Sequence, residues 1–309
     1  MRITRRTTSR RPFARRIALT VVASMIGAAS ATAHDFWIIP DMFAYAADAT
    51  VHVNGRQGGG KFPAGTAVQP ERVVDARIIG ATSTTKITVM SVEGSSLRLQ
   101  QKPAAAGQYL VVVGLAPRIL RQTPAGVIAF LKAEGGASEA GRLERENVLA
   151  GLDSVIFTAA SYAATLAQVG KGGPRAFGKA AGLRLEFVPL NDPAHVHVGD
   201  TLHVQVLGNG APVPSIGIDL ATGIDSAAGA GASVTRIAFN ADAKGIVHLP
   251  LSAAGPMMLR SAYASRKAGG APTEWDVSRT TYVFNVGTKH SRSPNDRPTP
   301  VSVHTGSAR

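Results

Sequence analysis

Short stretches in which hydrophobic and polar residues alternate cover most of this chain. A period of two is typical of half-buried β-strands, and clusters of Gly, Pro, Ser and Thr separate the stretches as turns do. The first half of the chain is predicted to form strands at 36–39, 50–54, 72–79, 86–92, 97–100, 108–113 and 155–169. The second half is predicted to form seven more, at 183–190, 201–207, 216–220, 233–239, 245–251, 257–263 and 280–286. Short strands at this spacing favour immunoglobulin- or transthyretin-like β-sandwiches.

The alternation is interrupted after Pro117, where two helices are predicted. Thr123 is suited to cap the first helix, Pro124 to occupy its first position, and Gly135 to end it. A second helix is predicted from 138 to about 152. The fold class is therefore predicted as mainly β, with two β-sandwich domains and a short helix pair inserted in the first.

The first 33 residues read as an export signal peptide. Seven arginines precede an apolar run at 17–29, and Ala31-Thr32-Ala33 follows as a small-residue cleavage signal. The apolar run is too short to cross a hydrocarbon core of ~30 Å as a helix. We therefore expect cleavage after Ala33, a mature chain that begins at His34, a periplasmic location, and membrane contact only through the signal peptide during export.

The route of export has two alternatives. The stretch Ser9-Arg-Arg-Pro-Phe-Ala-Arg15 resembles the twin-arginine consensus, in which a receptor reads the arginine pair as an address. An ordinary Sec signal with an arginine-rich start is the other alternative.

Composition divides the mature chain further. Glycines and basic residues at 171–182 predict a linker between a first domain at 34–170 and a second at 183–287, with a disordered tail at 288–309. Removing the seven arginines of the leader lowers the formal net charge from +13 to +6. No stripe of Lys and Arg with interleaved aromatic residues is present, which argues against nucleic acid as a partner. The absence of cysteine excludes thiolate metal ligands and a cysteine nucleophile.

Histidines are the candidate metal ligands. His34 would offer its free amine and its imidazole from one residue, which is a chelate for a divalent transition metal such as Ni, Co or Cu. His195 and His197 lie in a strand-like stretch that would point both rings to one face, and imidazoles suit Zn, Cu or Ni. His203 is a further candidate from a neighbouring strand. The alternative for the 195–197 pair is a wet sheet face, and His52 and His248 are interpreted as structural.

No pattern indicates catalysis. Carboxylates are scattered, and Asp219, Asp225 and Asp242 fall in or near turns, where Asp caps backbone groups. Ser215 lacks the GxSxG nucleophile elbow. We therefore expect a protein that is not an enzyme and holds no organic cofactor; a hydrolase whose residues meet only in space remains the alternative.

Several stretches resemble one protein family, DUF4198, described as NikM-like periplasmic components of nickel and cobalt uptake. The opening Ala33-His-Asp-Phe-Trp-Ile-Ile-Pro40 resembles the mature start of these proteins, and 183–193 and 208–214 resemble their second domain. The resemblance covers about 34–287. Ala164 and Ala262 stand where a basic or histidine residue is expected, and they weaken a polar site between the domains.

The resemblance implies a periplasmic accessory or binding protein for nickel or cobalt, with envelope transport components as partners. The residues themselves give His34, His195 and His197 as the candidate metal ligands. The alternative function is a structural or interaction β-sandwich module of the cell envelope that holds no metal.

Overall fold

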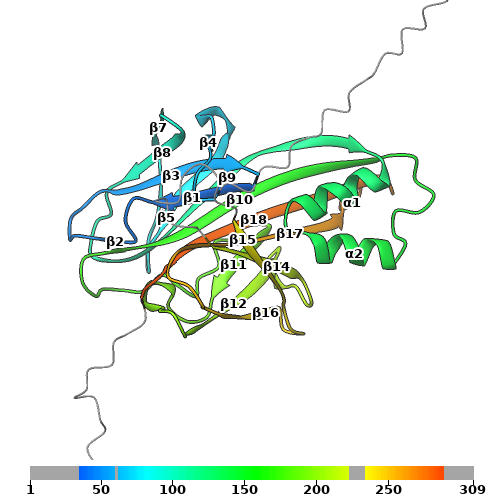
Figure 1. Ribbon diagram of the computed structural model, residues 1–309. Helices are drawn as coiled ribbons and strands as arrows, with labels where there is room; N and C mark the ends of the chain where they lie inside the picture. The colour runs from blue at the N-terminus through cyan, green and yellow to red at the C-terminus, as the bar shows by residue number, and fades with distance from the viewer. Residues whose placement is uncertain (1–34, 60–61, 223–233, 289–309) are drawn as a thin grey trace, which may run out of the picture. The chain divides into compact units, whose positions relative to one another are not determined.

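A computed structural model describes residues 35–59, 62–222 and 234–288 (Figure 1). The central sheet consists of β2 (Ala44–Tyr45), β5 (Val73–Ile79), β6 (Thr84–Lys86), β9 (Gly107–Gln122), β10 (Val155–Val169), β14 (Gly217–Thr222), β15 (Thr235–Asn240), β17 (Gly255–Arg266) and β18 (Glu274–Val286). A second sheet, sheet A, holds β1 (Asp35–Pro40), β3 (Val51–Gly58), β4 (Thr66–Ala67), β7 (Val89–Glu93) and β8 (Ser96–Gln101). A third, sheet C, holds β11 (Leu185–Pro189), β12 (Thr201–Gly208), β13 (Ala211–Pro212) and β16 (Ile246–Pro250). The predicted mainly-β class is confirmed.

The central sheet has a hydrophobic core on each face because its inner strands are apolar at both odd and even positions. In β9, Val111 and Val113 pack in the core that contains the β1, β3 and β8 side chains of sheet A. Leu110 and Val112 pack in the core that contains the side chains of sheet C. A strand that is apolar on both faces is expected to be covered on both faces.

The two helices are α1 (Pro124–Ala133) and α2 (Ala137–Arg145), and the 3-10 turns are η1 (Pro70–Arg72) and η2 (Pro193–His195). The predicted cap is confirmed, because the Thr123 hydroxyl accepts a hydrogen bond of 3.1 Å from the Gly126 amide. Val127 and Leu131 pack with Phe157 and Trp275 in a separate core cluster against β10 and β18. The helix pair thus covers part of the central sheet.

Three predicted boundaries are wrong in an instructive way. β9 continues beyond Pro117 to Gln122, since its full length pairs with β10. β18 begins at Glu274 rather than near 280, since its early residues pair in parallel with β10. Conversely, α2 ends at Arg145 rather than near 152. Pairing with the distant strand β10 lengthens β9 and β18. The helix α2 is shorter than predicted.

Strands of the two predicted domains share the central sheet. β10 lies between β9 and the parallel strand β18 (Figure 1), and ten residue pairs run from Ile156–Glu274 to Thr165–Val283. The predicted linker at 171–182 also makes contacts: Ala176 is fully buried, and the Lys179 ammonium donates to the carbonyls of Gly80 and Ala81. Whether 183–287 folds alone stays a prediction. The signal peptide, His34 and the tail beyond 288 lie outside the described residues.

Across the part of the chain that the structure describes, no helix has both the length and the apolar character needed to span a membrane.

Candidate functional site

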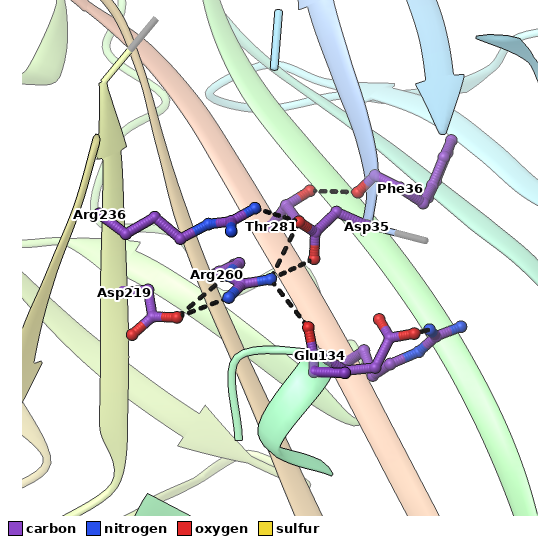
Figure 2. A network of polar contacts seen from close by, with 9 residues as sticks. Asp35, Phe36, Glu134, Asp219, Arg236, Arg260 and Thr281 are labelled. Carbon is purple, nitrogen blue, oxygen red and sulfur yellow. Dashed lines mark hydrogen bonds and ion pairs between the residues drawn. The ribbon is translucent and has the colours of Figure 1, made fainter. Parts of the chain in front are cut away.

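Six charged side chains meet where β1 begins and α1 ends, and we call them the charge cluster. Its members are Asp35, Glu134, Asp219, Arg236, Arg260 and Arg279 (Figure 2). They come from β1, the residue after α1, and strands β14, β15, β17 and β18. Three acids and three arginines balance in formal charge, so the cluster can be buried without a counter-ion.

Arg260 is the centre of the charge cluster. Its Nη1 lies 2.9 Å from Asp35 Oδ1, and its Nη2 lies 2.8 Å from Asp219 Oδ2. The same Nη1 donates to the carbonyl of Ala133 at 3.2 Å. Burial alone lowers the pKa of Arg260, but Asp35 and Asp219 outweigh burial and raise it. The guanidinium therefore stays charged and joins three elements.

Asp35 is the described residue closest to the predicted cleavage point. Its side chain is about 5% exposed, and Arg236 adds a second ion pair at 3.3 Å. Phe36, the next residue, accepts a hydrogen bond from the Thr281 hydroxyl through its backbone carbonyl at 2.7 Å. The start of β1 is therefore fixed by side chains from β15, β17 and β18.

Glu134 is the second buried acid of the charge cluster. Its carboxylate lies 2.5 Å from Arg279 Nη1, and the Arg279 guanidinium also lies over the Phe130 ring. Burial raises the pKa of Glu134, and Arg279 counteracts part of that rise. The carboxylate is therefore costly to ionise in the fold, and Arg279, with a smaller contribution from Arg260, offsets part of that cost.

A cavity of about 390 Å³ lies near the carboxyl end of β18, and we call it the histidine cavity. Its lining includes the side chains of His195, His197, Phe43, Gln168 and Asn285. Apolar walls with a few polar groups are typical of sites for small ligands. The structure therefore brings two of the three predicted metal ligands, His195 and His197, to one cavity.

The local structure around these two histidines differs from the predicted strand. His195 ends the 3-10 turn η2, and His197 forms an isolated bridge with Gly287. The His195 ring lies 3.0 Å from an Asp192 carboxylate oxygen and is 71% exposed. The His197 backbone amide donates to Asp200 at 2.9 Å. Pro193 begins the turn because its missing N–H costs nothing at a helix start.

The third predicted ligand, His34, lies outside the described residues, but its neighbour Asp35 is placed. The Phe36 carbonyl accepts a hydrogen bond from Thr281 in β18. His197 instead pairs with Gly287, which follows Thr281 by six residues and comes just after β18. Six residues of extended strand span roughly 20 Å. The described start of β1, at Asp35 and Phe36, therefore lies near Thr281 of β18 and away from Gly287 at the histidine cavity.

Sequence reasoning missed the charge cluster and one histidine pair. Arg260 falls between Met258 and Ala262 at a buried position of β17, and a charge at such a position is the signal that could have revealed it. Asp219 was expected in a turn but lies in β14, where it pairs with Arg260. Asp242 does cap a turn, accepting from the amides of Lys244 and Ile246. Asp225 lies outside the described residues.

His203 and His248 form the missed pair. They stand directly opposite each other on β12 and β16, with their Nδ1 atoms 2.6 Å apart. The sequence pattern leads us to interpret His248 as a structural residue, and the pattern does not indicate that His203 is its neighbour. Within the described ranges, no group of three or more His, Asp or Glu side chains is arranged to hold a metal ion.

The sequence profile of a domain of unknown function, DUF4198, matches residues 31–265. This match covers most of the chain, and the chain therefore belongs to that family. No curated protein matches the sequence. No catalytic family is indicated by these comparisons.

Solved structures of β-rich proteins show distant likeness. Trypsin-activated α2-macroglobulin from Escherichia coli is 12% identical, with a TM-score of 0.21, over 82% of this chain and 16% of that one. A DUF4785 protein from Legionella pneumophila is 8% identical (TM-score 0.22), over 72% and 50% of the two chains. Murine CEACAM1b is 9% identical (TM-score 0.20), over 83% and 100%. This chain thus spans a small part of the α2-macroglobulin, and scores this low carry no argument about function.

Proposed function

We propose that this DUF4198 protein is an exported, periplasmic binding protein that holds a divalent transition metal, nickel, cobalt or copper, through a mature terminus at His34. The observation that carries the proposal is the burial of Asp35 in the charge cluster. Because Asp35 is paired with Arg260 and Arg236, the residue before it is held within one residue length, ~3.8 Å, of a fixed backbone.

A fixed neighbour matters because ordering a flexible terminus costs free energy on binding. The amine and the imidazole of His34 come from one residue, so the first two ligands need no other element. The three acids of the charge cluster balance its three arginines, so the cluster has no net positive charge that would repel a metal cation. Further ligands would come from water or from an envelope partner that receives the metal.

The experiment compares two forms of the mature protein. One begins at His34, and the other carries H34A, which keeps the free amine but removes the imidazole of the chelate. Titration with Ni(II) and Cu(II) should give tighter binding to the first form, and binding should weaken as the pH falls through ~6.5 because imidazole must be neutral to ligate. Equal affinity of the two forms would contradict the proposal that the amino terminus chelates the metal.

Export is tested separately. The periplasmic fraction should contain a chain whose amino-terminal sequence begins His34-Asp35. If the twin-arginine route operates, replacing Arg10 and Arg11 together with Lys should stop export, whereas a Sec signal would tolerate the change. Detection of Met1 in the exported protein contradicts the assignment.

A second candidate function, a structural or interaction module without metal, is favoured by one observation. The acids and arginines of the charge cluster satisfy one another, so the cluster itself requires no ligand. In that case the cluster serves only to anchor β1, and neither form of the mature protein binds metal at its terminus.

A further inference from the structure

The exposed face of sheet C carries two imidazoles that point at each other. In β12, Leu202 and Val204 are buried in the core, and in β16 Val247 and Leu249 are buried. Since side chains alternate along a strand, His203 and His248 face away from that core. Their rings cross at 79° with centroids 4.8 Å apart.

The two Nδ1 atoms are so close that their lone pairs would repel each other unless a proton or a cation lay between them. At 2.6 Å, one Nδ1 carries a hydrogen and the other accepts it, so a single proton joins the neutral pair. A metal ion bound to both nitrogens at ~2.0–2.1 Å replaces that proton. Tetrahedral bonds of that length separate the nitrogens by roughly 3.3 Å, so exposed rings need to move apart by less than about 1 Å.

The backbone under the pair is rigid, which limits the entropy lost on binding. β12 is an inner strand between β11 and β16, and the His203 amide donates to Asn191 Oδ1 at 2.8 Å. The His203 carbonyl accepts from the Leu190 amide at 2.8 Å. Both rings are therefore presented from a fixed sheet with open solvent above them for water ligands.

The turn before β16 carries one acid and one base, so its formal charges balance. In this turn, a hydrogen bond from the Ile246 backbone, with smaller contributions from Lys244 and His248, lowers the pKa of the Asp242 carboxyl. The Asp242 carboxylate therefore stays negative, and the positive charge of Lys244 offsets it. The Lys244 backbone amide donates to Asp242, and its carbonyl accepts from Gln205.

We propose that His203 and His248 form a surface binding site for one divalent transition metal ion, with two imidazole nitrogens from the protein and water in the remaining positions. This site is separate from the proposed chelate at His34 and does not depend on it. Two nitrogen ligands suit Cu(II), Ni(II) and Zn(II), with Cu(II) bound most tightly. On binding, the shared proton moves from Nδ1 to Nε2 of its own ring, so each imidazole stays neutral and offers the Nδ1 lone pair to the metal.

The test uses the mature protein with H34A, which lacks the terminal imidazole, so that the amino-terminal chelate does not contribute. Imidazole signals are followed by NMR during addition of Cu(II), and affinities for Zn(II) and Cu(II) are measured by calorimetry. We expect the His203 and His248 signals to broaden first, well before those of His52. We expect H203Q and H248Q each to weaken binding by about tenfold or more, since each removes one of two ligands.

H52Q is the matched control, because His52 is the described histidine that belongs neither to this pair nor to the histidine cavity. It should leave the affinity unchanged. Thermal unfolding of H203Q and H248Q should match that of the parent, since both rings lie outside the core. If the H203Q, H248Q double variant binds Cu(II) and Zn(II) as tightly as the parent, or if the parent binds neither metal, the proposal is overturned. Either result leaves the test of the His34 chelate unaffected.

Discussion

The charge cluster and the histidine cavity lie along the same strand, β18, yet their polar groups are arranged oppositely. In the charge cluster, Arg260 and Asp35 are each less than 10% exposed and bind each other. At the histidine cavity, the His195 ring is 71% exposed and faces a space of about 390 Å³. Buried ions that satisfy one another fix a structure, whereas the exposed His195 ring is held by a single pairing with Asp192 beside a cavity. Position along β18 therefore separates buried, fully paired ions from an exposed ring.

The largest expected effect comes from removing the centre of the charge cluster. R260A leaves Asp35 and Asp219 buried without their main counter-charge, and losing one partner of a buried pair typically costs about 3–5 kcal/mol. R236A removes a half-exposed partner and should cost at most ~1 kcal/mol. Urea unfolding of the mature protein measures both. Similar losses in the two variants would mean that the cluster does not depend on its centre.

The next effect concerns pH and Glu134. Burial raises the pKa of this carboxyl in the folded protein, so at intermediate pH the folded state holds more protons than the unfolded state. Its contribution to the free energy of unfolding is therefore greatest at low pH and falls as the pH rises from about 4.3 through the folded-state pKa.

E134Q should remove that decrease, and at pH 7 it should be at least as stable as the parent, because the neutral amide avoids the cost of a buried charge that the raised pKa reflects. Urea unfolding at several pH values between 4 and 7 gives both quantities. If the pH slope is the same in E134Q and the parent, the buried carboxyl is not the group responsible.

A smaller effect is expected at the histidine cavity. A Cβ placed on Gly287 would lie 2.6 Å from Cδ2 of His197, so G287A forces the imidazole to move. Overpacking of this kind costs about 1–3 kcal/mol, and a ring near the surface should bring the value to the lower end. The NMR signals of His197 should shift while those of His203 stay unchanged. An unshifted His197 ring would show that the bridge to Gly287 is looser than the structure indicates.

The smallest effect on stability is expected from nicking the predicted linker. Lys171 and Arg175 are exposed, whereas the Lys179 side chain is held by two carbonyls, so trypsin should cut at 171 and 175 before 179. Both the charge cluster and the histidine cavity contain residues from each side of this segment. The nicked halves should therefore elute together on gel filtration. Separation into two folded halves would support independent domains.

Local chemistry predicted much of the fold. The Thr123 cap requires only the next three residues, and the turn at Asn209–Gly210 joins β12 to β13 because both residues take positive φ, at 50° and 81°. The long strands were predicted too short, because β9 and β18 gain their extra residues by pairing with β10. Sequence pattern cannot show such pairing at a distance.

The candidate sites were predictable to a smaller degree. His195 and His197 are two residues apart, and the structure does bring both to one cavity. The charge cluster unites β1, the end of α1 and four later strands, and no short motif contains two of its members. His203 and His248 are 45 residues apart, and only the register of β12 with β16 makes them partners.

The pairing of Asp35 with Arg260 also means that one partner is synthesised long before the other. The two residues are 225 positions apart, and ribosomes add about 5–20 residues per second, so Asp35 emerges roughly 10–45 s before its partner exists. During that interval β10 has β9 on one side and an open edge on the other, because β18 is made last. Open strand edges recruit other chains. A growing or truncated chain that stops before Glu274 therefore lacks the strand that covers this edge of β10.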